Sequence, residues 1–379
     1  MWPALAAAGL VALAGCSGAP AWLTFKEGAE KPAALVDFKA VATVRTLWHA
    51  DVGSAGDSVF SPAVSDASVF AAATAGQLAR FDAASGKQIW RVETGRKLSG
   101  GVGAGSNMVL VGTPKGEVLA YDGAGKSLWK AQLSSEVLSA PQPVDGMVVA
   151  RTGDGRIFGL DASDGKRKWM YQGIVPALSL RSHAGVVVSH GAVFAGFAGG
   201  KLVALNLSNG SVGWEASVAQ PRGTTELERI ADITSVPVLD ERQVCAVAYQ
   251  GRVACFESKS GNLLWARDVS SSMGLAMDEH GLYVADDKGA VIAYDKGTGA
   301  TLWKQDKLTA RRVTAPLPLG ERLAVADLQG YVHLLSREDG AFVARSATDG
   351  SPVPAPAAAL DGGFVVQTAN GGLYALSIQ

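Results

Sequence analysis

Cys16 has the most specific chemical setting of any residue in this sequence. It closes the string LAGC at the end of an apolar stretch, residues 4–15, that is too short to cross a bilayer comfortably. A thiol here can accept a diacylglyceryl group, and the small residues before it suit a lipoprotein signal peptidase. We therefore interpret residues 1–15 as a lipoprotein signal peptide, Cys16 as the lipidation site and residues 16–40 as a tether.

The residues around Cys16 also bear on where the chain is sent. An ordinary secretory signal that contains a cysteine by chance is the alternative to a lipoprotein signal. The opening string MWP has no Lys or Arg, so the true start could lie upstream of Met1. Ser17 follows the cysteine, where an aspartate would favour retention in the inner membrane. The predicted location is the outer membrane, with the lipid-anchored protein facing the periplasm.

Cys245 and Cys255 flank a predicted hairpin turn at residues 249–251, each at the same distance from its centre. Such positions stand opposite each other in two antiparallel strands. In an oxidising periplasm they could form a disulfide, although cross-strand bridges are often strained. Two buried free thiols are the alternative, and the spacing leaves both open.

No other reactive residues have the spacing of a catalytic or metal site. The five histidines are scattered without ligand spacing. The string GGVGAG, residues 100–105, imitates a phosphate-binding loop but leads into a predicted strand, and we expect a Gly-rich inner strand. The net charge of −1 gives no electrostatic reason for nucleic-acid binding. We predict a protein that is not an enzyme and holds no metal or cofactor.

A repeated segment supplies the framework for these residues. It reads GEVLAYDGAGKSLW at residues 116–129 and GAVIAYDKGTGATLW at residues 289–303, and its alternation of apolar and polar residues predicts β-strands. The Asp and Gly between the two strands favour a tight turn. Another hairpin precedes each copy, so each unit has four short strands with a period of about 40 residues, as in a propeller blade.

Eight copies of the glycine that opens this segment predict eight blades. The last copy lacks its outer strand, whereas residues 44–48 form an outer strand with no blade before it. We therefore predict an all-β, eight-bladed β-propeller of four-stranded blades over residues 41–379, closed by the N-terminal strand joining the C-terminal blade. The glycines are Gly76, Gly116, Gly155, Gly200, Gly251, Gly289, Gly330 and Gly372.

Tryptophans recur at the outer-strand position of the repeat, and we interpret them as packing between neighbouring blades rather than as a binding cage. The aspartates of the turns are interpreted as turn formers rather than metal ligands. These aspartates are Asp82, Asp122, Asp161 and Asp295. The tryptophans are Trp48, Trp90, Trp129, Trp169, Trp214, Trp265 and Trp303, and Ala344 takes this place in the seventh copy.

Two connections between successive blades are longer than the others. From the Trp of one copy to the Gly of the next there are 31 residues after Trp169 and 37 after Trp214, against 24 to 27 elsewhere. All such connections lie on one face of a propeller, so the two long loops should be neighbours on a rigid support. The first contains Leu178 and Leu180, which we expect to project from the loop.

The second long loop, residues 223–237, has the Thr-x-x-Glu spacing of a helix cap and an apolar trio, which predict a short helical turn. Its charged side chains would then be free to pair with Arg181 or with a partner protein. Loop filler that merely covers the end of the propeller is the alternative. The predicted partner-binding residues are Leu178, Leu180, Arg181, Glu226, Arg229 and Asp232.

The repeat, the lipobox and the two long loops together resemble the BamB family of outer-membrane β-barrel assembly factors. The repeat alone is weakly specific, whereas the strings LSLR, residues 178–181, and GTTELERIAD, residues 223–232, are more so. The resemblance extends from Cys16 to the C-terminal strand. It implies a scaffold lipoprotein that docks on a periplasmic POTRA domain of BamA. The other lipoproteins of the machinery, and nascent β-barrels, are further partners that it implies.

The resemblance also implies which residues meet BamA. Leu178, Leu180 and Arg181 match the family's first contact string, and Asp232 matches the first of two acidic positions. Thr234 stands at the second, which removes one expected salt bridge. The leading alternative is a quinoprotein dehydrogenase, which shares the repeat. Such an enzyme would need a quinone in the central channel, calcium and usually an adjacent cysteine pair, and the three cysteines here are not adjacent.

Overall fold

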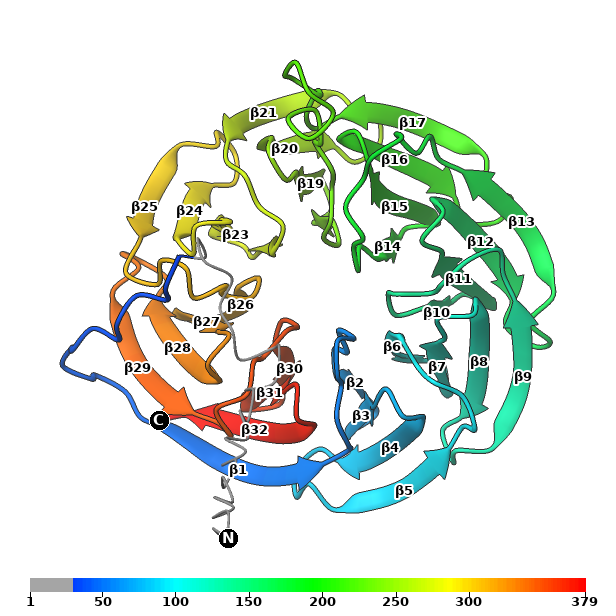
Figure 1. Cartoon of the computed structure of the whole chain (residues 1–379), viewed down its shortest axis with the longest axis horizontal. Helices are drawn as coiled ribbons and strands as arrows, with labels where there is room; N and C mark the ends of the chain where they lie inside the picture. The colour runs from blue at the N-terminus through cyan, green and yellow to red at the C-terminus, as the bar shows by residue number, and fades with distance from the viewer. Residues whose placement is uncertain (1–29) are drawn as a thin grey trace, which may run out of the picture.

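Eight antiparallel sheets of four strands each form a ring around a central axis in the computed structural model, which describes residues 30–379 (Figure 1). The predicted eight-bladed, all-β propeller is therefore confirmed. Residues 1–29, which include the predicted signal peptide and Cys16, lie outside the described residues. Among residues 30–379 no helix is long and apolar enough to span a membrane.

Blades one to seven each use four consecutive strands, numbered from the axis outwards. Blades one and two are β2 (Ala63–Ser65), β3 (Ser68–Ala72), β4 (Gln77–Asp82), β5 (Gln88–Glu93), β6 (Gly100–Gly105), β7 (Met108–Gly112), β8 (Glu117–Asp122) and β9 (Ser127–Gln132). Blades three and four are β10 (Gln142–Val144), β11 (Met147–Arg151), β12 (Arg156–Asp161), β13 (Arg167–Gln172), β14 (Val186–Ser189), β15 (Ala192–Phe197), β16 (Lys201–Asn206) and β17 (Val212–Ser217).

The remaining blades complete the ring. Blades five and six are β18 (Val238–Leu239), β19 (Gln243–Val247), β20 (Arg252–Glu257), β21 (Leu263–Asp268), β22 (Gly274–Met277), β23 (Gly281–Ala285), β24 (Val291–Asp295) and β25 (Thr301–Gln305). Blade seven is β26 (Leu317–Leu319), β27 (Arg322–Ala326), β28 (Tyr331–Ser336) and β29 (Phe342–Ala347). Blade eight is β30 (Ala358–Leu360), β31 (Gly363–Gln367), β32 (Gly372–Ile378) and β1 (Val44–Asp51).

The core lies between the blades rather than inside any one sheet. The second and third strands of a blade are buried on both faces, as all five residues of β7 show, because each face packs against a neighbouring blade. One apolar cluster joins Phe70 of blade one to Val109 and Tyr121 of blade two. Outer strands such as β5 keep the alternation of exposed and half-buried residues that their position at the rim requires.

The predicted closure of the ring is confirmed. β1 pairs antiparallel with β32 from Val44 opposite Ile378 to Asp51 opposite Gly372. The first described strand therefore supplies the outer strand of the last blade (Figure 1). This pairing covers the outer edge of β32 and completes blade eight as a four-stranded sheet.

The tryptophans join neighbouring blades, as predicted. Trp129 of blade two donates its indole Nε1–H to the carbonyl oxygen of Ala162 in blade three at 2.8 Å. Its ring lies over Gly165, where φ is +73° and any Cβ would clash with the indole. The same bond recurs from Trp48, Trp90, Trp169, Trp214, Trp265 and Trp303 to Ala83, Gly123, Leu207, Ser258, Lys296 and Arg337.

Ala344 stands where an eighth tryptophan would dock, and the closure explains the exception. The turn that would receive it should join the third and outer strands of blade eight. Those strands are β32 and β1, which lie at opposite ends of the described chain, so no such turn exists. Phe342 of β29 instead stacks on Phe38, with ring centroids 5.4 Å apart.

The turn aspartates and the Gly-rich strand also follow the sequence. The Asp161 carboxylate accepts the hydroxyl of Ser163 at 2.6 Å and its backbone N–H at 2.8 Å, and these hydrogen bonds, with that of Lys168, hold the pKa of Asp161 below its usual value. Residues 100–105 form β6, the inner strand of blade two. A Cβ at Gly103 would overlap the carbonyl oxygen of Pro141 in blade three, so the close approach of the two blades requires glycine.

Candidate partner-docking surface

Two long connections lie side by side on one face of the ring, and we refer to them together as the two-loop surface. Residues 173–185 link β13 to β14, and residues 218–237 link β17 to β18 (Figure 1). The second of these loops is anchored on blades four and five, since Ile233 packs on Gly196 of β15 and the Tyr249 N–H, just after β19, donates to the Asp232 carbonyl oxygen at 2.8 Å. The predicted adjacency of the two loops is thus present.

Asp232 joins the two loops from within. Its side chain is buried, with 2% of the residue exposed. One carboxylate oxygen accepts the backbone N–H of Leu180 at 2.7 Å, and the other accepts that of Gly199 at 2.9 Å. The expectation that Asp232 is free to pair with Arg181 or with a partner is therefore wrong, because its carboxylate is used to hold the first loop in place.

Arg181 pairs with Glu136, a residue that the sequence reasoning missed. Its Nε and Nη2 donate to the two carboxylate oxygens of Glu136 at 3.1 and 2.9 Å. The bonds to Glu136 raise the pKa of Arg181 above its usual value. Glu136 lies between β9 and β10, in a connection of ordinary length, and no motif marks it. The pair forms an oriented charged group on the exposed side of the first loop.

A second missed residue, Arg151, lies beneath the loops. Its guanidinium donates to the carbonyl oxygen of Gly196 and lies 4.9 Å from the centre of the Phe197 ring. Burial lowers the pKa of Arg151 to about 10, while the charge of Asp232 acts in the opposite direction. Arg151 is the last residue of β11, the second strand of blade three. Nothing in the sequence distinguishes it from the last residue of any other predicted strand.

A cavity of about 260 Å³ opens between these groups. The apolar part of its wall is formed by Leu180, Val175 and Phe197. The charged part is formed by Arg151, Glu136 and Arg181. Leu178 is 44% exposed beside it, as expected for a projecting leucine, whereas Leu180 is half-buried. The arrangement can take an apolar side chain into a pocket that has a charged rim.

The second loop makes both the predicted cap and the predicted short helical turn. The Thr225 hydroxyl accepts the N–H of Glu228 at 3.2 Å, and the Glu228 carboxylate accepts the N–H of Thr225 at 3.1 Å. The backbone N–H of Thr224, at 2.8 Å, and that of Thr225 hold the pKa of the Glu228 carboxyl below its usual value. The Arg229 N–H donates to the Thr225 carbonyl oxygen at 3.2 Å, which closes one helical turn over residues 226–229, and no longer helix follows. Beyond the turn, Ile233 is 1% exposed and belongs to the core.

The other charged residues of the second loop remain at the surface. Glu226 and Arg229 approach each other to 4.0 Å, and both side chains are more than half exposed. They do not contact Arg181 or Asp232 in any hydrogen bond or ion pair of residues 30–379. Leu227 between them is 68% exposed, which adds an apolar group to the two-loop surface.

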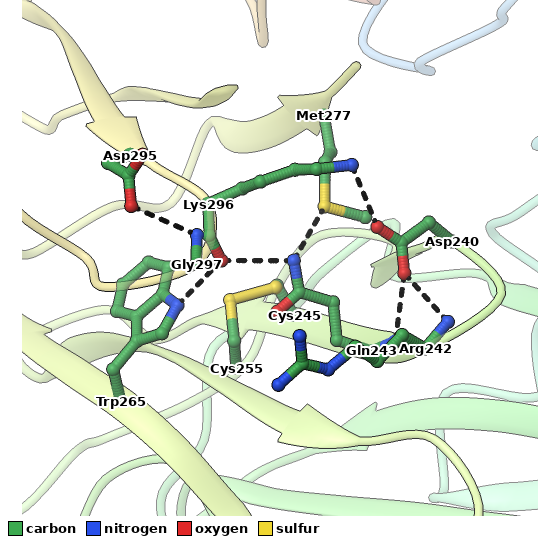
Figure 2. The surroundings of a disulfide bond; sticks show 10 residues. All are labelled: Asp240, Arg242, Gln243, Cys245, Cys255, Trp265, Met277, Asp295, Lys296 and Gly297. Atoms are coloured by element: carbon green, nitrogen blue, oxygen red, sulfur yellow. Dashed lines mark hydrogen bonds and ion pairs between the residues drawn. A yellow bond between two sulfur atoms is a disulfide. The ribbon is translucent and has the colours of Figure 1, made fainter. Parts of the chain in front are cut away.

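Cys245 and Cys255 form a disulfide, which decides between the two alternatives left open by the spacing. They are directly opposite in β19 and β20, with Cα atoms 4.1 Å apart, and both are fully buried. Figure 2 shows the bridge beside the indole of Trp265. The Lys296 carbonyl oxygen accepts from Trp265 and from the Gln243 amide at 2.9 and 3.1 Å.

A comparison of the sequence with protein-family models decides the family. The model described as outer membrane protein assembly factor BamB matches residues 33–97, 74–305 and 287–379. The chain belongs to the BamB family. The predicted resemblance is thereby confirmed over nearly all described residues.

Curated BamB proteins match over most of their length. The protein named outer membrane protein assembly factor BamB from Nitrosomonas eutropha is 51% identical over 348 residues, 92% of this chain and 85% of the relative. The BamB of Bordetella pertussis is 42% identical over 96% of this chain and 94% of the relative. The crystal structure of BamB from Moraxella catarrhalis has a TM-score of 0.82 at 25% identity, covering 88% of this chain and 100% of that one.

A quinohemoprotein alcohol dehydrogenase from Comamonas testosteroni shares the propeller fold with this BamB family member. Its TM-score is 0.71 at 13% identity, over 88% of this chain and 76% of that one, which shows a likeness of fold alone. Within residues 30–379, no group of three His, Cys, Asp or Glu side chains is placed to hold a metal ion.

Proposed function

We propose that this chain is a lipid-anchored periplasmic scaffold that assists outer membrane protein assembly by docking on a POTRA domain of BamA. The observation that carries the proposal is the hydrogen bond from Leu180 N–H to the buried Asp232 carboxylate. It joins two loops that are separate in the sequence into one surface. The match to proteins named outer membrane protein assembly factor BamB supplies the context.

The physical character of the two-loop surface suits a protein partner. Leu178 is an exposed apolar group beside a cavity, Leu227 is exposed on the second loop, and the Arg181–Glu136 pair stands at the rim of the cavity. Apolar side chains that fill such a cavity would provide most of the binding energy, while the oriented charges would select the partner and its register. Glu226 and Arg229 are exposed and would extend the charged rim.

A binding experiment tests the docking site. Purified BamA periplasmic domains would be titrated with this chain and with Leu178→Ala/Arg181→Ala. We expect the double variant to bind at least about tenfold more weakly, since it removes one apolar contact and the oriented charge. Leu302→Ala is the matched control, because Leu302 is 55% exposed on β25, away from the two loops. Equal loss in both variants, or loss in neither, would contradict the assignment.

Lipidation is tested separately. Cys16→Ser removes the only thiol that the proposal modifies, so the chain should move from the membrane fraction to the soluble periplasm. The folded propeller should be unchanged, as judged by its circular dichroism. A Cys16→Ser chain that still sediments with outer membranes would show that another part of the molecule, or its partner, supplies the attachment.

A further inference from the structure

Residues 33–41, which precede β1, lie along blade seven, and we call this segment the arm. The Ala33 N–H donates to the Thr309 carbonyl oxygen at 2.9 Å, and the Val41 N–H donates to that of Val343 at 3.0 Å. In Figure 1 the arm, in blue, passes outside β29 before it enters β1. The described part of the predicted tether is thus in contact with the propeller from Ala33 onward.

A buried arginine holds the start of the arm. Arg311, only 1% exposed, donates from Nη1 to the Ala33 carbonyl oxygen at 2.8 Å. Its Nε donates to the Asp327 carboxylate at 2.7 Å and its Nη2 to Gln329 at 2.7 Å. A fully buried cation needs its charge and its donors satisfied, and the arm's backbone supplies one of the acceptors.

A second arginine holds the middle of the arm. Arg345 donates from Nη2 to the Val36 carbonyl oxygen at 3.1 Å and from Nε to His333 at 3.2 Å. Its guanidinium lies 5.0 Å from the ring of Phe38, which stacks on Phe342. The arm therefore has two backbone carbonyl oxygens bound by arginines, and one aromatic ring seated on β29.

We propose that the arm is a permanently bound strap, so that the lipid anchor pulls on the propeller at Ala33 and not at the start of β1. This inference rests on the proposed lipidation of Cys16. The charged cluster of Arg311, Arg345, Asp327 and His333 is a peptide-binding site whose occupant is this chain's own arm. The bound length shortens the reach of the tether from about 100 Å, measured to β1, to about 60 Å, measured to Ala33.

The position of the strap relates the anchor to the partner. Arg311 belongs to the connection between blades six and seven, whereas the two-loop surface is formed by the connections after blades three and four. All these connections lie on the same face of the ring, because each joins an outer strand to the next inner strand. The anchor and the two-loop surface therefore share one face, and they are two to three blades apart around the central axis.

Hydrogen exchange of the full chain tests the strap. The Ala33 and Val41 amides should exchange at least about tenfold more slowly than in Phe38→Ala, which removes the seated ring and its contact with Arg345 but leaves the buried pair of Arg311 and Asp327 in place. Lys39→Ala is the matched control, because Lys39 is exposed on the same segment. It should leave the exchange of both amides unchanged. Amides of the inner strands should be equally protected in all three proteins.

The outcomes separate the strap from the anchor. Fast exchange of Ala33 and Val41 in the unaltered chain, or equal release by Phe38→Ala and Lys39→Ala, would overturn the strap.

The measurement is made on the Cys16→Ser chain and on lipidated protein in vesicles of phosphatidylethanolamine and phosphatidylglycerol. Protection in both supports the strap with its anchor at Ala33. Loss of protection only on the vesicles would overturn the inference, because the anchor would then pull the arm free.

Discussion

At the scale of single residues, Asp232 shows how a buried side chain can shape a surface from beneath. Its carboxylate accepts two backbone N–H groups from separate segments and lies near the buried Arg151. The string GTTELERIAD marks Asp232 in the sequence, but its type and spacing suggest an exposed acid. The burial of Asp232 and its hydrogen-bond partners indicate a positioning role. Neither can be derived from the local sequence pattern.

The positioning role predicts a difference between Asp232→Ala and Arg181→Ala. Asp232→Ala leaves two buried donors unpaired, so the free energy of unfolding should fall by about 2–4 kcal/mol and BamA binding should weaken as well. Arg181→Ala breaks an exposed pair and should cost about 0–1 kcal/mol while weakening binding. Urea unfolding together with the binding titration checks both. Equal stability of the two variants would argue against the positioning role.

His333 predicts a dependence of stability on pH. Arg345 can only donate, so His333 Nδ1 accepts its N–H, and Nε2 carries the proton that bonds to Asp327 at 2.8 Å. Burial lowers the pKa of this neutral histidine below its usual 6.5, despite the opposing effect of Asp327. The unfolded chain therefore takes up the proton first as the pH falls. Stability should be lost below about pH 6.5, at up to about 1.4 kcal/mol per pH unit.

The variant His333→Gln isolates this effect, because glutamine can donate to Asp327 and accept from Arg345 without titrating in this range. Urea unfolding between about pH 7.5 and pH 5.5 would be compared for both proteins. The stability advantage of the unaltered chain over His333→Gln should shrink as the pH falls. An advantage that stays constant would show that His333 does not contribute to the pH dependence of stability. Burial also lowers the pKa of His183, but this residue is present in both proteins and affects them equally.

At the scale of elements, the repeat predicts the strands well because each copy independently has the residue pattern of the same strands and turns. Alternation and turn residues recur along the chain, and the Trp position is kept in every blade except the seventh, where Ala344 replaces it. The predicted helical turn after Thr225 forms, because propensity and capping act over a few residues. The burial of Ile233 instead depends on its contact with Gly196 in blade four. The sequence pattern alone does not show this contact between Ile233 and Gly196.

The docking of tryptophans predicts a graded loss of stability at Trp169. Trp169→Phe keeps a ring over Gly210 but loses the bond to the Leu207 carbonyl oxygen, which should cost about 1–3 kcal/mol. Trp169→Ala also empties the space between blades three and four and should cost about 3–5 kcal/mol. Thermal and urea unfolding would measure both changes. A Phe variant as damaging as the Ala variant would show that the bond, and not the ring, governs the contact.

The disulfide makes a prediction within blade five. Mass spectrometry of unreduced Cys16→Ser chain, alkylated after unfolding, should find no free thiol, and reduction should reveal two. Cys245→Ala/Cys255→Ala should lower the free energy of unfolding by up to about 3 kcal/mol, with less loss if the ring already confines the hairpin. Full alkylation without reductant would contradict the bridge.

At the scale of the whole molecule, the number of blades and the closure of the ring could be derived from counting. The incomplete last copy and the isolated first strand are both visible in the printed sequence, and the pairing of β1 with β32 confirms their relation. The strap along blade seven could not be derived. The arm is held mainly through the carbonyl oxygens of Ala33 and Val36, and a backbone carbonyl is present at every residue.

The closure also governs the order of folding. Val44 must pair with Ile378, so blade eight cannot form until nearly the whole chain has crossed into the periplasm. Blades one to seven use consecutive strands and can assemble as they emerge, but the ring stays open until then. Contacts of such large sequence separation are slow to form. A newly exported chain therefore has an interval in which β1 and the inner strands of blade eight are exposed edges, and it depends during that interval on whatever protects unfolded proteins in its compartment.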